Sequence, residues 1–376
     1  MRLIINTTTL SGTGVTQVAC SFINECKDFP DINYYVFLSK TVAGQIDVSF
    51  FPSNFQFFYF EDHPLYGTKG FKVRKELRRL EREIKPDVVF TVFGPACWTP
   101  QVPHISGFAN SYYVFPNSPF FDVISKKDWF RIYLLKIAHR FFLKRNGRFF
   151  ICETEAMRIG LADYLKIPLS RIFTVSNTYS KIYDNEEYLK RTPLLTPAEV
   201  DEFRFLILAS YDIHKNLTIL NNVIPLLQDL SHDVKIKFVL TISDKALEEN
   251  FREEVKKTII NLGRVDVNDC PGLYEQCDAV FLPTLIESFS ANYPEAMKMR
   301  KPIMTSDLPF ARSICEDAAY YFDPLDPNDI VTKIVQLVNN PTLRNNLIEK
   351  GSKRLSYFGD SKQRTSNYLK IINSII

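Results

Sequence analysis

The sequence lacks the cysteine patterns that build small secreted domains and zinc sites. Its seven cysteines form no Cys-x-x-Cys pair and are odd in number. This usage argues against a disulfide framework and a structural zinc site, and it favours a reducing compartment. No uncharged run of about 18 apolar residues occurs, and the apolar stretch at the start is too short for a signal peptide. We therefore expect a cytoplasmic protein, either soluble or peripheral at the inner face of the plasma membrane.

The sequence is also poor in net charge and in glycine. Its 46 basic and 43 acidic side chains leave a formal charge of +3, too little to predict nucleic acid as a partner. Glycine numbers only 13, against 31 phenylalanines, a composition typical of AT-rich bacterial genomes. We find no internal repeat and no low-complexity tract, so a repeat architecture is not expected.

What is present is an ordinary globular composition in a chain too long for one core. With 376 residues, of which 45% are hydrophobic and 24% charged, two domains are expected. Residues 1–180 alternate short apolar runs with longer amphipathic segments, as in βα units around a parallel sheet. The strands predicted for this first domain are 2–6, 34–38, 87–92, 103–108, 148–152 and 172–175.

A polar stretch that contains Pro193 and Pro197 makes residues 181–202 the expected linker. A second alternating series occupies residues 203–360. One helix is predicted to begin near residue 215, and a second is predicted to span 244–261. The predicted strands are 203–209, 234–240, 278–283 and 303–306. Both halves thus predict Rossmann-like, doubly wound α/β domains, which bind ligands at the carboxyl ends of their strands. We expect the two domains to face a central cleft.

The most informative segment runs from Glu287 to Glu295. The strand at 278–283 precedes a turn at 288–292, and a helix is predicted over 293–300. Unpaired N–H groups at a helix start favour an anion, and ionised carboxylates accept hydrogen bonds from hydroxyls. A diphosphate and a sugar together would use both features, so the segment suits a nucleotide-sugar. The simpler alternative is that Glu295 only complements the helix dipole.

The residues around this segment carry a family resemblance. From Leu262-Gly-Arg-Val, through Tyr274 to Ser290, and on from Pro294-Glu-Ala-Met to Asp307, the sequence closely resembles retaining GT-B glycosyltransferases of family 4, the glycosyl transferases group 1. The resemblance implies a GT-B fold, a last helix at 361–376 that returns to the first domain, and no cofactor. The sequence has no Asp-x-Asp segment to hold a divalent cation against diphosphate, so no metal is expected.

The resemblance also implies roles for individual residues. Glu287 would take hydroxyls of the transferred sugar, although a nucleophilic Glu287 is an alternative, and Glu295 would take ribose hydroxyls. Lys215 would hold the diphosphate and stabilise its charge on departure. Gly263, Arg264 and Val265 would meet the base through their backbone. The diphosphate would also lie on amides around Ser288, Phe289, Ser290 and Ala291.

Two departures from the family pattern stand out. The family's arginine, several residues before the lysine, is replaced by the stretch Ala209-Ser-Tyr211, so Arg264 or a hydroxyl would compensate. The family's His-Asp or His-Glu pair is missing as well. Either Ala109-Asn110 stands in its place or the histidine has shifted to His104, although the simpler interpretation of His104 is a hydrogen-bonded strand residue. The pair His232-Asp233 is interpreted as a plain loop.

Gly12 and Gly14 follow the first predicted strand. Glycine there lets the backbone approach a phosphate or a sugar closely, but a tight turn into a helix would explain it equally well. The family commonly has a glycine-rich loop at this place, near the donor phosphates and the acceptor.

Two basic segments, 69–85 and 126–145, predict cationic amphipathic helices. Such faces lie on anionic lipid or are ordinary exposed surfaces. The second segment has few balancing acids and is the better membrane candidate.

The predicted function is transfer of a sugar from a nucleotide-diphosphate sugar, UDP-sugar favoured and GDP-sugar second. The acceptor would be a glycan or a lipid-linked molecule in bacterial surface polysaccharide synthesis, either lipopolysaccharide O-antigen or capsule. A catalytically silent, membrane-associated assembly partner and a GT-B nucleotide-sugar epimerase are the alternatives.

Overall fold

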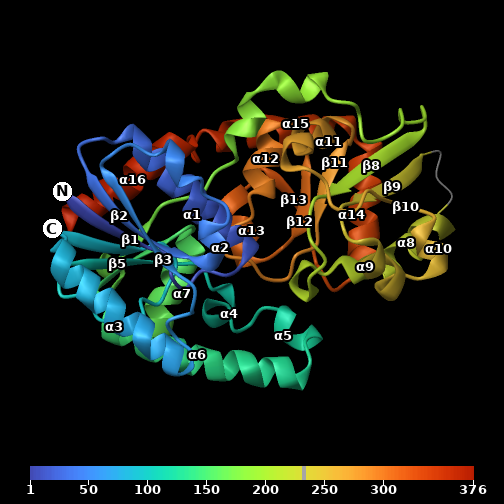
Figure 1. The fold of residues 1–376 in the computed structure, drawn as a ribbon. Helices are drawn as coiled ribbons and strands as arrows, with labels where there is room; N and C mark the ends of the chain where they lie inside the picture. Colours follow the sequence, from blue (N-terminus) through green and yellow to red (C-terminus); the bar gives the residue numbers. More distant parts are fainter. Residues whose placement is uncertain (231–233) are drawn as a thin grey trace. The chain divides into compact units, whose positions relative to one another are not determined.

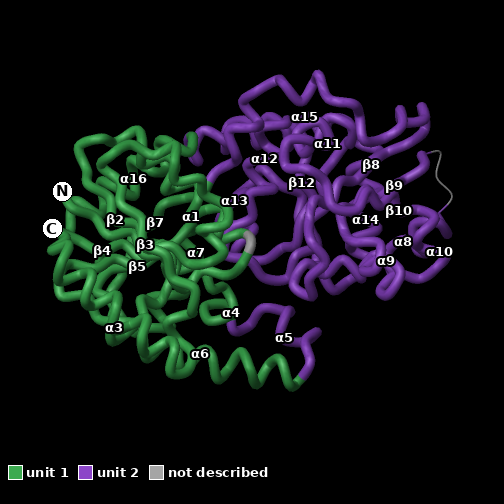
Figure 2. Tube along the Cα trace, viewed as in Figure 1, with its two compact units in different colours: residues 1–115, 126–177, 360–376 green, residues 116–125, 178–359 purple. Residues whose placement is uncertain are grey.

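The computed structural model describes residues 1–230 and 234–376, so the pair His232-Asp233 lies outside the described residues (Figure 1). The chain divides into two compact units (Figure 2). Unit 1 contains residues 1–115, 126–177 and 360–376, and unit 2 contains residues 116–125 and 178–359. The chain therefore passes between the units four times, and segment 116–125 leaves unit 1, joins unit 2 and returns.

Unit 1 is built on a parallel sheet in the order β3-β2-β1-β4-β5-β6-β7. Its strands are β1 (Arg2–Asn6), β2 (Asn33–Ser39), β3 (Phe55–Phe60), β4 (Val88–Thr91), β5 (His104–Phe108), β6 (Phe149–Cys152) and β7 (Ile172–Thr174). The order reverses between β1 and β4, where a doubly wound sheet opens a crevice for ligands. The sequence did not predict β3, because this edge strand is a run of aromatics without a regular alternation.

The helices of unit 1 cover the sheet and supply its core. They are α1 (Thr13–Glu25), α2 (Lys40–Ala43), α3 (Gly67–Ile84), α4 (Ser111–Val114), α6 (Lys126–Asn146), α7 (Glu155–Leu165) and α16 (Ser361–Ser374), with short 3-10 helices η1 (Cys26–Asp28), η2 (Val48–Phe50) and η3 (Leu169–Arg171).

The last helix, α16, is attached to unit 1 by a ring contact and a buried cation. Tyr368 packs edge-on against Phe22, with ring centroids 5.4 Å apart. The buried Arg364 donates to Oγ of Ser21 at 2.6 Å and to the side-chain oxygen of Asn177. The Nε of Arg364 is also buried and has no hydrogen-bond partner in the described chain, so these two bonds are the ones that compensate the burial of the guanidinium and hold α16 on unit 1.

Unit 2 contains a second parallel sheet, in the order β10-β9-β8-β11-β12-β13. The strands are β8 (Glu202–Ile207), β9 (Lys235–Leu240), β10 (Ile259–Asn261), β11 (Ala279–Leu282), β12 (Ile303–Ser306) and β13 (Ala319–Phe322). Stacked rings of Phe205 and Phe238, 5.6 Å apart, lie in its core. The order reverses between β8 and β11, which makes the loops after these strands the expected ligand edge of this unit.

Helices on both sides of this sheet complete unit 2. The α-helices are α5 (Phe120–Val123), α8 (Leu220–Asp229), α9 (Asp244–Asn250), α10 (Glu253–Lys256), α11 (Cys270–Glu275), α12 (Asn292–Lys298), α13 (Pro309–Cys315), α14 (Pro327–Asn339) and α15 (Pro341–Leu355). The 3-10 helices are η4 (Lys181–Asp184), η5 (Glu186–Lys190), η6 (Ile213–Lys215), η7 (Leu217–Ile219) and η8 (Val267–Asp269). The stretch expected as a linker thus carries η4 and η5 and belongs to unit 2.

Two predicted helices of unit 2 were wrong in part. The segment 244–261 is broken by an extended residue at Phe251 and ends in the strand β10. Buried Ile259 pairs with Phe238 of β9, so tertiary pairing of a β-branched residue overrides the helical pattern. The helix expected from residue 215 begins only at Leu220, because Asn216 takes the left-handed conformation with φ of 53°.

Candidate active site

Two loops meet at the point of unit 2 where the strand order reverses. The loop after β8 contains Lys215, and the loop after β11 contains Glu287. The N–H of Leu285 donates to the carbonyl of His214 at 2.8 Å, and the amide of Asn292 donates to the carbonyl of Leu208 at 2.8 Å. These bonds bring together side chains that lie 72 positions apart in the sequence.

The ammonium of Lys215 forms an ion pair with the carboxylate of Glu287. Both side chains are mostly buried, with 16% and 19% of their surface exposed. Burial also lowers the pKa of the neighbouring His214, and the charge of Lys215 lowers it further, so this imidazole is neutral near pH 7. The site therefore holds one cation and one anion that neutralise each other, and an anionic ligand would compete for the cation.

Glu295 lies in α12 and is held by tyrosines that the sequence did not single out. The hydroxyl of Tyr274, in α11, donates to its carboxylate at 3.2 Å. Burial raises the pKa of Glu295 to about 7, while hydrogen bonds from Tyr183 and Tyr274 lower it. The rings of Tyr183 and Tyr274 pack edge-on with centroids 5.8 Å apart. Tyr183 comes from the stretch expected to be a linker, so no local signal connected it to Glu295.

The turn before α12 carries the predicted phosphate amides. Ala291 is the residue before the helix, and Phe289 is buried against Phe358, with ring centroids 6.1 Å apart. Since α12 has only seven residues, its dipole contributes little, and Lys215 is the stronger anion-binding group.

Gly263 follows β10 at the carboxyl edge of the same sheet. Its φ of +66° lies in the left-handed region that favours glycine, so the turn at Gly263, Arg264 and Val265 has a backbone reason for its glycine.

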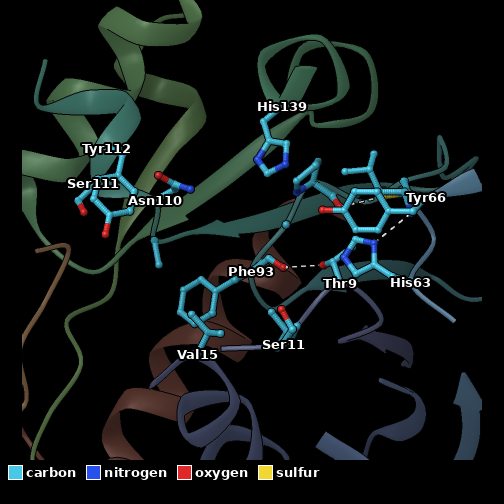
Figure 3. A pocket seen from close by; sticks show the side chains of 16 residues that line it. Thr9, Ser11, Val15, His63, Tyr66, Phe93, Asn110, Ser111, Tyr112 and His139 are labelled. Atoms are coloured by element: carbon cyan, nitrogen blue, oxygen red, sulfur yellow. Dashed lines mark hydrogen bonds between the residues drawn. The ribbon is translucent and has the colours of Figure 1, made fainter. Parts of the chain in front are cut away.

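Unit 1 contains a cavity of about 310 Å³ at its own reversal of strand order (Figure 3). This is room for about ten water molecules. Thr9 and Ser11 come from the loop after β1, Phe93 from the loop after β4, and Asn110 from the loop after β5. Figure 3 shows Asn110 and Tyr112 on one side and His63 and Tyr66 on the opposite side, with His139 of α6 between them.

The cavity is polar but uncharged. None of the 16 lining residues, all within the described chain, is Asp, Glu, Lys or Arg. Burial lowers the pKa of His63 and of His139, and the nearness of His63 lowers that of His139 further, so both imidazoles are neutral near pH 7. His139 is oriented by a contact of 3.3 Å between its Nδ1 and the hydroxyl of Tyr113. The cavity thus offers hydroxyl, amide and imidazole groups to a neutral ligand.

Of the two acceptor-side candidates, the structure places only Asn110 in the cavity. The side-chain oxygen of Asn110 is buried and finds no hydrogen-bond partner in the described chain. His104 lies in the interior of β5, and its ring contacts the hydroxyl of Thr91 at 3.0 Å and the carbonyl of Asn146 at 2.9 Å. Burial lowers the pKa of His104 to about 4, so it is a neutral core residue.

Gly12 and Gly14 open α1 beside Ser11. Gly12 has φ of −86°, and an added Cβ would make only an ordinary contact of 3.5 Å with Val15. At Gly14 an added Cβ would meet nothing within 4 Å. The turn itself therefore does not require either glycine.

The helix α6 has an exposed apolar face. Six large side chains are roughly half exposed: Trp129, Phe130, Tyr133, Leu134, Ile137 and Phe141. At about 100° per residue they fall within an arc of about 140°, while Leu143 on another face is buried. Arg140 and Lys144 fall within the same arc and Arg145 lies at its border, and these cations line a shallow groove with Ile137 and Phe141. The prediction of an amphipathic helix over 126–145 is therefore wrong, because cations and apolar side chains share one face of α6.

The other basic helix, α3, differs from α6. It buries Val73, Leu77 and Leu80, and its Arg79 is paired with Glu76 and Glu83. No helix within residues 1–230 and 234–376 is long and apolar enough to cross a bilayer. In the same residues no group of three or more His, Cys, Asp or Glu side chains is placed to hold a metal ion.

Comparisons with known proteins agree with this architecture. Residues 196–354 match the family model described as Glycosyl transferases group 1, and no curated protein matches the chain. A glycosyltransferase from Rickettsia africae is similar over 100% of this chain and 98% of its own, with a TM-score of 0.72 and 14% identity. HepE of Anabaena in complex with UDP-glucose covers 100% of both chains, with a TM-score of 0.68 and 13% identity.

A third similar structure is WaaG, a glycosyltransferase involved in lipopolysaccharide biosynthesis, which is similar over 99% of both chains, with a TM-score of 0.66 and 13% identity. At such identities the structural similarity establishes the fold. The chain therefore has the GT-B fold with two Rossmann-like α/β domains, and its residues 196–354 form a domain that matches glycosyl transferases group 1.

Proposed function

We propose that this protein is a retaining glycosyltransferase of family 4 that uses a nucleotide-diphosphate sugar. The observation that carries the proposal is the Lys215–Glu287 ion pair, which lies at the reversal point of the sheet in the domain that matches the family. A cation and a carboxylate at one ligand edge fit a donor with an anionic diphosphate and a hydroxyl-rich sugar. UDP-sugar is the favoured donor, in keeping with UDP-glucose in the similar Anabaena structure, and GDP-sugar is second.

In the proposed mechanism the diphosphate displaces Glu287 from Lys215. The freed carboxylate of Glu287 then accepts hydrogen bonds from the sugar, and Lys215 stabilises the charge that develops on the departing diphosphate. The bond between the anomeric carbon and the phosphate oxygen breaks, and a bond to the acceptor oxygen forms on the same face. The acceptor proton passes to the leaving phosphate oxygen, so the step balances without a metal ion or a cofactor.

The remaining donor contacts follow the family assignment. The base lies on the backbone of Gly263, Arg264 and Val265, the ribose on Glu295, and the diphosphate also on amides near Ser288 to Ala291. The loop after β8 has Ala209-Ser-Tyr211 where the family has an arginine, so Lys215 would contribute more of the phosphate binding than in the family pattern.

We assign the cavity of unit 1 to the acceptor. Its neutral lining suits sugar hydroxyls better than a phosphate or a carboxylate, because an anion would find no cation among the lining residues to pair with. The unpartnered oxygen of Asn110 is the best placed acceptor for a sugar hydroxyl. Gly12 and Gly14 leave open backbone near Ser11, which suits the close approach of a ligand.

The exposed face of α6 supports peripheral binding to anionic lipid. Apolar side chains with aromatic rings would enter the interface, and the cations interspersed among them would meet lipid phosphates. Because His139 of the same helix lines the acceptor cavity, a lipid-linked acceptor would reach it from the membrane. We propose the cytoplasmic face of a bacterial plasma membrane and surface polysaccharide assembly, O-antigen or capsule, as the setting.

The first experiment is a thermal-shift panel of UDP, GDP, ADP and their common sugars, with and without magnesium. A ligand that binds the folded state alone must raise its stability, by about 2.7 kcal/mol at 100 times its Kd. Selective stabilisation by one nucleotide without magnesium supports the proposal. Glu287→Gln would then slow sugar transfer by orders of magnitude. No shift with any nucleotide at millimolar concentration would contradict it and favour the silent assembly partner.

Membrane binding has its own test, by cosedimentation with vesicles that contain anionic or only zwitterionic phospholipid. We expect binding to anionic vesicles alone, and loss of binding in Ile137→Glu. Val267→Glu is the matched control, since Val267 is similarly exposed but lies in unit 2. Equal loss in both variants would contradict the assignment of α6.

A further inference from the structure

Segment 116–125 belongs to unit 2, although the chain before and after it belongs to unit 1. Figure 2 shows this short piece, which contains α5, in the colour of unit 2 between α4 and α6. The segment buries Phe120 and contacts η6, the turn that ends in Lys215. It is therefore part of the surroundings of the candidate donor site, although it comes from a distant part of the sequence.

Ser118 connects this segment to the loop after β11. Its hydroxyl donates to the carbonyl of Leu285 at 2.7 Å and accepts from the N–H of Phe120 at 3.2 Å. The bond from the N–H of Phe120 orients the serine at the start of α5, and the single O–H of Ser118 remains to donate. It donates to the carbonyl of Leu285.

Leu285 is fully buried, and its backbone is fixed on both sides. Its N–H donates to the carbonyl of His214, and its carbonyl accepts from Ser118. Glu287 follows two residues later, and Lys215 follows His214 directly. The positions of Lys215 and Glu287 thus both depend on the backbone of Leu285. Ser118 supplies one of the two hydrogen bonds that hold this backbone in place.

We infer that Ser118 is a positioning residue for Glu287. It fixes the position of the loop after β11 through its hydrogen bond to the carbonyl of Leu285, and it does not itself contact substrate. The inference rests on the proposed function, in which Glu287 binds the transferred sugar and Lys215 the diphosphate. Catalytic side chains tolerate displacements of only about 0.5 Å, so a loop that moves by one lost hydrogen bond no longer presents Glu287 correctly.

The expected signature separates turnover from nucleotide binding. In Ser118→Ala the loop is released, and kcat for UDP release from UDP-glucose, or from the nucleotide-sugar that the thermal-shift panel selects, falls by about tenfold or more. The Kd for UDP, measured by calorimetry, should not rise, because UDP has no sugar for Glu287 to hold and a displaced Glu287 competes less for Lys215. Ser118→Thr keeps the hydroxyl and restores kcat.

Asn117→Ala is the matched control, since Asn117 is exposed in the same segment. It should leave kcat, Kd and the melting temperature as in the wild type. A fall in kcat of equal size in Asn117→Ala would show that the segment tolerates no change at all, and it would overturn the specific role of the Ser118 hydroxyl.

Hydrogen exchange provides a readout that does not need activity. Peptides that cover residues 283–291 should exchange faster in Ser118→Ala than in the wild type, Ser118→Thr and Asn117→Ala, all measured well below their melting temperatures. Unchanged exchange in these peptides overturns the inference, whatever the kinetics. If the wild type releases no nucleotide from any nucleotide-sugar, the proposed function fails, while the exchange experiment still decides whether Ser118 holds the loop.

Discussion

Removing the carboxylate of Glu287 should tighten the binding of UDP, although it should slow sugar transfer. In the ligand-free protein Glu287 forms an ion pair with Lys215, the cation proposed to bind the diphosphate. Glu287→Gln removes the competing anion and retains a side chain of nearly the same size. The variant therefore separates two roles that the ion pair combines, since nucleotide binding should improve while sugar handling deteriorates.

The size of the effect follows from the burial of the pair. Two unit charges about 4 Å apart attract by about 4 kcal/mol at an effective dielectric constant of about 20. The two side chains are 16% and 19% exposed, so water screens part of this attraction. The ammonium of Lys215 loses water to either partner, so only the difference between the carboxylate and the diphosphate counts. We expect a net gain of about 1 kcal/mol, which is about fivefold in Kd.

Titration calorimetry with UDP at about 0.15 M salt measures this gain. Lys215→Ala should weaken UDP binding, and the double variant should show that Glu287→Gln no longer helps once the lysine is gone. Glu254→Gln, an exposed carboxylate of α10, controls for the change in net charge. Weaker UDP binding in Glu287→Gln would refute the competition and make Glu287 a direct contact of the nucleotide.

Three further outcomes are expected. Folding raises the pKa of Glu295 from 4.5 to about 7, so the protonated side chain contributes stability that is fully present below pH 4.5 and is lost as the pH rises through 7. In chemical denaturation the free energy of unfolding should fall by about 2 kcal/mol between pH 5 and pH 8. The Glu295→Gln variant should lack this fall. Asn110→Ala should not lower the melting temperature, because it removes a buried oxygen without a partner, yet it should raise the KM for the acceptor. Gly263→Ala should cost about 1 kcal/mol of unfolding free energy in a urea titration, because its φ is positive, and an unchanged midpoint would contradict the left-handed turn.

Much of the fold was predictable because most of the parallel strands are short apolar runs that can be recognised in the local sequence. The strands β1 and β12 have the predicted bounds, since each is a short apolar run between clear breaks. The strands β3, β10 and β13 escaped prediction. Each is defined by pairing with a neighbour rather than by its own pattern, and β10 also follows a helical stretch without a strong breaker.

The candidate site was predictable only at residues that belong to a local motif. Glu287, Glu295 and Lys215 came from local segments and the family resemblance, and the structure brings Lys215 and Glu287 together. The partners of Glu295 did not come from the sequence, because Tyr183 lies in another segment and only packing places it there. The cavity residues His63 and His139 were missed for the same reason, since neither histidine sits in a motif and they meet only in the folded unit.

The order of the chain has a consequence for how the protein forms on the ribosome. Residues 1–115 of unit 1 are made before unit 2 is complete, whereas α16, with Arg364 and Tyr368, is synthesised after residues 178–359 of unit 2. At usual rates of elongation, roughly 10 to 40 seconds pass between the end of residue 177 and the start of α16. During that time the apolar surface around Phe22 and Phe90 has no α16 to cover it. All residues of unit 2 are thus synthesised before unit 1 has its last helix. We therefore expect the incomplete unit 1 to be exposed to chaperones for longer than unit 2.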